Sequence, residues 1–85
     1  MIWNYRVLKT THLSHSGDTE DCYAIHEVYY TDDGNPEMWS SDPVSPHGET
    51  VDELKSDMAL MHGAFEKPIL VLTKGDDAST LTEQT

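Results

Sequence analysis

One amphipathic helix in the second half of this chain constrains its fold more than any other feature. Thr50 and Glu53 match a capping box, in which the threonine side chain accepts from the amide three residues later and the glutamate reaches back. Apolar residues then recur at spacings of three and four, which places them on one side of a helix. This apolar stripe consists of Val51, Leu54, Met58, Met61 and Phe65. Gly63 weakens the last turn and Pro68 stops the helix.

Strand patterns occupy the segments on both sides of this helix. Residues 2–10 alternate aromatic and β-branched side chains with others, and residues 22–30 are partly apolar on both faces, which is typical of a central strand. The polar segment 12–21 between them predicts a long hairpin loop. A short third strand is expected at residues 37–41, and the apolar run at residues 69–73 predicts a buried strand.

Together these segments predict one α+β domain at residues 1–73 with the order β-β-β-α-β. We expect an antiparallel sheet with one helix packed on one face. Residues 74–85 are rich in Gly, Asp, Ser, Thr and Gln, so we expect a flexible, disordered and acidic C-terminal tail. A chain of 85 residues builds a thin core, and the second face of the sheet lacks a helix to cover it. That face, or an edge strand, is expected to dock another chain.

The chain is strongly acidic, with 16 Asp and Glu against 5 Lys and Arg and a formal net charge of −11. DNA, RNA and anionic lipid each need a positive footprint, so the charge argues against direct binding to nucleic acid or to a membrane. It favours a basic protein partner, for instance a nucleic-acid-binding protein. Solubility alone is the simpler interpretation of the same charge.

The expected location is the cytoplasm. Cys22 is the only cysteine, so no intrachain disulfide can form, which fits a reducing compartment. The first residues lack the basic region and long apolar run of a signal peptide. No apolar stretch approaches the roughly 20 residues needed to span a bilayer.

The sequence offers little for catalysis, so we expect no enzyme activity and no cofactor. His12 and His15 are weak candidates for a metal site, but their spacing matches no standard zinc site. Cys22 and His26 share a strand face at a separation of about 13 Å, too far for a nucleophile and its base. A core position is expected for the Cys22 thiol. An enzyme or metal protein that uses His12, His15 and Cys22 is the remaining alternative.

Two groups of exposed residues are the candidates for binding a partner. Met58 and Met61 could form an adaptable face for a partner helix, but the need to cover the sheet favours a core role for them. The acidic residues near the helix start and at the second hairpin, together with Leu60, are the better candidates. They are Glu49, Asp52, Glu53, Asp57, Leu60, Asp32, Asp33 and Glu37.

The run Gly-Glu-Thr-Val-Asp-Glu-Leu at residues 48–54 opens the helix after a strand pair, a short third strand and a proline-containing connection. This arrangement resembles the N-terminal domain of HicB-type antitoxins, which has a partial RNase-H-like or double-stranded-RNA-binding-like fold, over about residues 2–73. The resemblance implies a domain that neutralises a small basic RNA-cleaving toxin by covering its surface. The chain departs from the family's Pro-x-x-Pro-Gly-Cys-like stretch at residues 42–48, and a polar tail stands where the family adds a DNA-binding segment.

Three functions outside catalysis stay open. The leading hypothesis is a small non-catalytic module that masks a basic protein partner, such as an RNase toxin or a nuclease. The second is a phage-type nucleic-acid mimic that inhibits a nuclease or a CRISPR effector, which requires acidic side chains spaced like phosphates on one face. The third is a self-associating domain without a ligand, and a homodimer is compatible with the other two.

Overall fold

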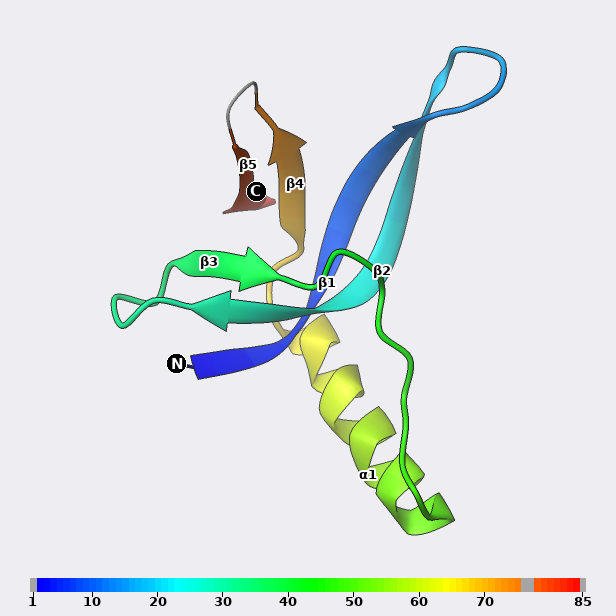
Figure 1. Cartoon of the computed structure of the whole chain (residues 1–85), viewed down its shortest axis with the longest axis vertical. Coiled ribbons are helices and arrows are strands. Elements are labelled where there is room, and N and C mark those ends of the chain that lie inside the picture. Colours follow the sequence, from blue (N-terminus) through cyan, green and yellow to red (C-terminus); the bar gives the residue numbers. More distant parts are fainter. Residues whose placement is uncertain (1, 76–77, 85) are drawn as a thin grey trace.

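A long antiparallel hairpin forms the centre of the computed structural model, which describes residues 2–75 and 78–84 (Figure 1). Its strands are β1 (Ile2–Leu13) and β2 (Thr19–Tyr30), paired in register over their whole length. Both strands extend into the polar segment predicted as a loop at residues 12–21. The predicted loop is therefore too long, because main-chain pairing between strands needs no apolar side chain.

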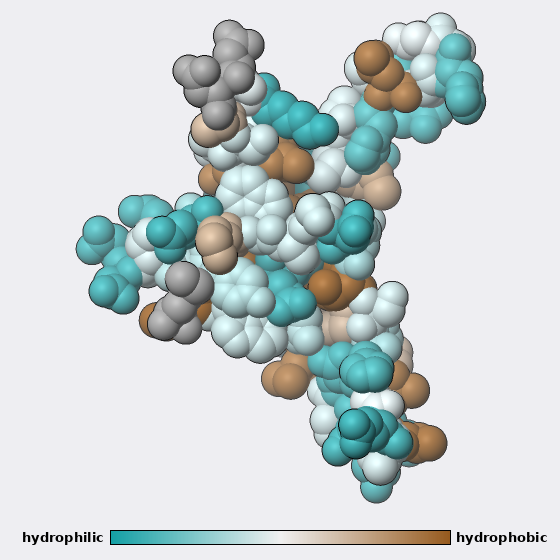
Figure 2. Space-filling model, viewed as in Figure 1, coloured by the Kyte–Doolittle hydropathy of each residue, from teal (hydrophilic) through white to brown (hydrophobic). Residues whose placement is uncertain are grey.

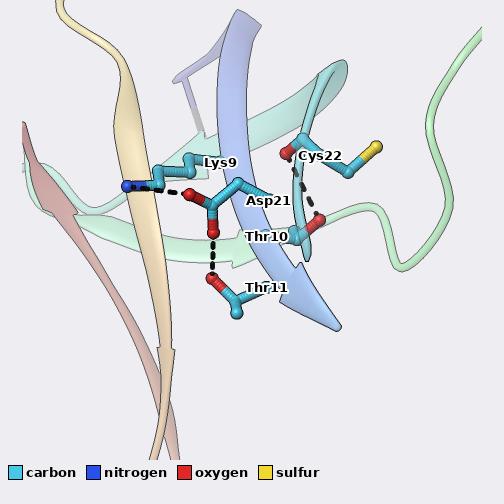
Figure 3. A network of polar contacts seen from close by, with 5 residues as sticks. All are labelled: Lys9, Thr10, Thr11, Asp21 and Cys22. Carbon is cyan, nitrogen blue, oxygen red and sulfur yellow. Dashed lines mark hydrogen bonds and ion pairs between the residues drawn. The ribbon is translucent and has the colours of Figure 1, made fainter. Parts of the chain in front are cut away.

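The far half of this hairpin, residues 9–23, is named the polar arm. Contacts between its own two strands hold it together (Figure 3). Asp21 accepts a hydrogen bond from the Thr11 hydroxyl at 2.9 Å and lies 3.6 Å from the Lys9 ammonium. Thr10 donates to the Cys22 carbonyl at 3.5 Å, and the Cys22 thiol points away from the other residues of the network. The cysteine is exposed, so the core position expected for it is wrong.

The remaining strands extend the sheet on both sides of the hairpin, in the order β3-β2-β1-β4-β5. β3 (Pro36–Trp39) pairs antiparallel with β2, and β5 (Ser79–Glu83) pairs antiparallel with β4 (Leu70–Lys74). β4 runs parallel to β1, because the chain crosses over through α1 (Val51–His62) and a 3₁₀ turn (Gly63–Glu66) before it returns to the sheet. The α+β class is confirmed, but the sheet is mixed, and the antiparallel arrangement is wrong for the pair of β1 and β4.

The expectation of a disordered tail at residues 74–85 needs one correction, because Ser79–Glu83 form β5. Leu81 faces the core and is only 9% exposed, whereas the residues on either side of it are exposed. Main-chain pairing with β4 and one buried apolar side chain dock the strand, and the average composition of the segment hides both. Residues 76–77 and 85 of the predicted tail lie outside the described part of the chain.

The main apolar core lies on the face of the sheet that α1 does not cover. Its members are Leu8, Val28, Leu70 and Leu81, with Tyr30, Trp39 and Leu72 packed around them. Strand alternation and register place all of these side chains on one face. The sheet curls, so that Trp39 on β3 and Leu72 on β4 pack on one cluster although β2 and β1 lie between their strands. The face expected to lie open is therefore filled by the sheet itself.

α1 packs on the opposite face through its C-terminal end. Met61 and Ala64 are buried there, and Val7 of β1 is buried on the same face. The first turns of the helix project beyond the strands (Figure 1). Within the described ranges, no helix has both the length and the apolar character that a membrane crossing requires.

A buried arginine ties β1 to the chain just before β4. Arg6 is 6% exposed and donates to the Tyr30 hydroxyl at 3.0 Å and to the Pro68 carbonyl at 2.6 Å. The Tyr30 hydroxyl donates in turn to Asn4 Oδ1 at 2.6 Å. Because a buried charge is costly unless it is hydrogen-bonded, this network fixes where the chain leaves the helix and begins β4.

Candidate functional site

The start of α1 is built as the sequence predicts. Thr50 is the N-cap residue, and its hydroxyl accepts from the Glu53 amide at 3.1 Å. The Glu53 carboxylate accepts from the Glu49 amide at 2.8 Å, one residue further back than in the usual capping box. The predicted cap is confirmed, and it also holds the connection that runs from β3 to the helix.

Gly48 lets this connection lie directly against the helix. A Cβ atom at this position would sit 2.5 Å from the Leu54 amide nitrogen and 2.7 Å from the Glu53 Cβ. Such distances are far below van der Waals contact, so any side chain here would push the connection away from α1. The Gly-Glu-Thr run at residues 48–50 thus has a local structural reason for its glycine.

Asp57 joins three separate parts of the chain. One carboxylate oxygen accepts from the Tyr5 hydroxyl of β1 at 2.9 Å, and the other accepts from the His47 amide of the connection at 2.8 Å. Burial, followed by the hydrogen bond to Asp57, raises the pKa of Tyr5 to about 12. The tyrosine is therefore a hydrogen-bond donor at neutral pH and holds the carboxylate in one orientation.

A hollow opens beside α1 around this carboxylate, and we name it the acidic hollow. It is lined by Tyr5, Glu27, Val44, Ser45, His47, Asp52, Glu53, Ser56, Asp57 and Leu60. Four of these residues carry carboxylates, and none of the lining residues is a lysine or an arginine. Leu60 is 66% exposed at its edge. Carboxylates beside an exposed apolar side chain suit a basic residue, whose charged head and aliphatic stem both find a partner.

The structure brings together half of the predicted partner-binding residues. Asp52, Glu53, Asp57 and Leu60 line the acidic hollow, and the exposed Glu49 is tied to Glu53 through its amide.

Asp32, Asp33 and Glu37 lie elsewhere, on the hairpin between β2 and β3, far from the start of α1 (Figure 1). Asp32 and Glu37 line a separate shallow hollow there. A mimic of nucleic acid requires one continuous acidic face, and these two groups do not form one.

Sequence reasoning missed Tyr5 and Glu27, the two residues that the sheet contributes to the hollow. They are direct cross-strand partners in β1 and β2. Alternation places Tyr5 and Val7 on one face of β1, but apolar residues occur on both faces, so the pattern does not tell which face the helix covers. The connection residues in the hollow carry no sequence signal, because distant contacts hold them: the Val44 amide donates to the Ile25 carbonyl, and the His47 amide donates to Asp57.

The core role predicted for Met58 and Met61 is correct for Met61 and wrong for Met58. Met61 is buried and Leu54 is half-buried, whereas the exposed fraction is 67% for Val51, 55% for Met58 and 66% for Phe65. The first turns of α1, with Val51, project beyond the strands, and Phe65 lies past the helix in the 3₁₀ turn. Apolar side chains accordingly lie on the surface along the helix (Figure 2).

The predicted metal candidates lie on the polar arm. His12 and His15 are exposed, and a His12 ring nitrogen lies 3.0 Å from the Thr10 hydroxyl. Over residues 2–75 and 78–84, no group of three or more His, Cys, Asp or Glu side chains is placed to hold a metal ion.

Comparison with known proteins identifies no relative of this chain. No protein-family model, curated protein or solved structure matches the chain. The resemblance to HicB-type antitoxins therefore stays a prediction, and the assignment of function depends on the residues of the site.

Proposed function

We propose that this chain is a small, non-catalytic protein-binding module that masks a basic, nucleic-acid-binding protein partner in the cytoplasm, in the manner of HicB-type antitoxins. The acidic hollow is the observation that carries this proposal. Glu27, Asp52, Glu53 and Asp57 line one hollow together with the exposed Leu60, and no lysine or arginine is among the lining residues.

The few basic residues of the chain leave its negative field largely unopposed. Arg6 is buried, and Lys9 lies beside Asp21 on the polar arm. A net charge of −11 on 85 residues attracts a basic partner and speeds the encounter with it. A toxin RNase or a nuclease has such a basic surface, because it must bind phosphates.

The carboxylates of the hollow can still accept hydrogen bonds from a partner. An ionised carboxylate has about four acceptor positions. Asp57 uses two of them, for Tyr5 and His47, and Glu53 accepts from Glu49. These internal bonds orient the oxygens before the partner arrives, which lowers the entropic cost of binding.

The experiment that tests this proposal is an affinity pull-down from the native host with mass spectrometry and a salt series. We expect a basic RNase or nuclease that is retained at low salt and released as salt rises. If only the chain itself is recovered, the masking function is wrong, and a self-associating domain replaces it. Recovery of neutral or acidic proteins alone would also contradict the proposal.

A further inference from the structure

An aromatic patch on the exposed part of the sheet adjoins the acidic hollow. Trp3, Tyr5 and Tyr29 lie on the helix side of β1 and β2, where Trp3 pairs with Tyr29 and Tyr5 pairs with Glu27 across the strands. The Trp3 ring packs edge-on against Tyr5 at a centroid distance of 5.2 Å and is tilted against Tyr29 at 6.1 Å. Trp3 is 45% exposed, and Met38 beside Tyr29 on β3 is 52% exposed.

Two hydrogen bonds join this patch to the carboxylates of the hollow. The Tyr5 hydroxyl donates to Asp57, and the Tyr29 hydroxyl donates to Glu27, both at 2.9 Å. A second hollow, lined by Trp3, Tyr5 and Leu60 among others, continues the surface, because Tyr5 and Leu60 line both hollows. Its lining also includes one acidic and one basic residue, Glu66 and Lys67.

The aromatic patch and the acidic hollow together form a surface whose chemistry distinguishes arginine from lysine. A guanidinium is planar, stacks on an aromatic face and bonds a carboxylate through two parallel N–H groups. An ammonium is a compact point charge that is more strongly hydrated, so it gains less from an aromatic ring next to a carboxylate. The exposed Trp3 ring, beside two half-buried tyrosines that are hydrogen-bonded to carboxylates, is therefore complementary to arginine.

We propose that the aromatic patch and the acidic hollow together bind an arginine-bearing segment of the basic partner, with one guanidinium stacked on Trp3 and bonded to Glu27 or a neighbouring carboxylate. This inference rests on the proposed masking function and names the chemistry that the partner presents. The charge of the surface selects a cationic segment, and the aromatic rings select arginine over lysine.

The test compares two synthetic seven-residue peptides of equal charge, in which glycine alternates with arginine or with lysine. Each is titrated into the full chain at low salt, and backbone amide shifts report both the affinity and the site. We expect about fivefold tighter binding of the arginine peptide, with the largest shifts in β1, β2 and α1. Equal affinities, absence of binding, or shifts confined to other elements would overturn the inference.

Two variants and a control keep this test independent of folding. Trp3→Leu and Tyr29→Leu should each reduce the preference for arginine to less than twofold, with residual binding that depends on salt. Tyr23→Leu removes another exposed tyrosine from the same face of β2 and should retain the full preference. Amide spectra of the free variants show whether each one is folded. Preference for arginine that survives both patch variants would contradict the inference, whereas the pull-down decides the masking function separately.

Discussion

The Tyr5 hydroxyl donates to Asp57 at 2.9 Å across 52 positions of the chain. This single bond links the central strand of the sheet to the only α-helix among the described residues. Asp57 also accepts from the His47 amide, so one carboxylate positions β1, α1 and the connection together. The acidic hollow depends on this junction, and several measurements can test it.

Tyr5→Phe removes the hydroxyl and keeps the ring. We expect the free energy of unfolding to fall by about 1 kcal/mol, because the half-buried carboxylate loses a donor while the aromatic packing remains. Urea unfolding of the variant and the parent chain measures the difference. Unchanged stability would show that the bond does not hold the helix to the sheet.

The same hydroxyl predicts a loss of stability at alkaline pH. Its pKa is raised in the folded chain to about 12 from an ordinary value of 10, so the unfolded chain loses its proton first. The stability due to this group is fully present below pH 10 and is lost as pH rises from 10 to 12. The free energy of unfolding should therefore fall between pH 10 and pH 12. It should fall less in Tyr5→Phe, which lacks the hydroxyl. If the free energy of unfolding varied with pH in the same way for the parent chain and for Tyr5→Phe, the effect would not be due to the Tyr5 hydroxyl.

Gly48→Ala should destabilise the chain by about 1–3 kcal/mol, because its Cβ would overlap the backbone at the start of α1. Gly63→Ala is the matched control, since nothing lies within 4 Å of a Cβ at that helical position. There we expect no loss, or a small gain in stability. Urea midpoints of both variants provide the comparison, and equal effects would argue against the close approach of the connection.

Arg6→Met tests the buried network between β1 and β4. The variant leaves the Tyr30 hydroxyl and the Pro68 carbonyl without their donor, which should cost about 1–3 kcal/mol. Lys9→Met removes a surface ion pair instead and should change stability by less than about 1 kcal/mol. Thermal or urea unfolding distinguishes them, and a larger effect from Lys9→Met would contradict the structure.

Leu81→Ala tests whether β5 belongs to the fold. A buried leucine truncated to alanine costs about 2–5 kcal/mol, whereas Thr80→Ala on the exposed side of the same strand should cost little. A disordered segment would respond to neither change. Equal and negligible effects on unfolding would restore the disordered tail that the composition predicts.

The local parts of the fold could be read from the sequence, and the relations between distant segments could not. The cap at Thr50 and Glu53 depends on a spacing of three residues, so the pattern alone predicts it correctly. The burial of Leu81 depends on a cluster contributed by β1, β2 and β4, which no local pattern reveals. The stripe predicts a helix correctly, but it does not show that Met58 stays exposed or that Phe65 lies past the helix, in the 3₁₀ turn.

The candidate site also combines residues that a local pattern predicts with residues that only distant contacts bring together. Asp52, Glu53, Asp57 and Leu60 share a helix, and their spacing brings them to one side of it. Tyr5 and Glu27 reach the hollow only because β1 and β2 pair in the observed register. The polar residues at the tip of the hairpin do not predict this register.

The most direct test of the masking surface compares two double variants that change the net charge equally. Asp52→Asn with Glu27→Gln removes two charges from the acidic hollow, and Asp32→Asn with Asp33→Asn removes two from the distant hairpin. Affinity for the captured basic partner should fall at least tenfold for the first pair and less than threefold for the second. Equal losses would mean that only the overall charge matters, and that the hollow is not the binding surface.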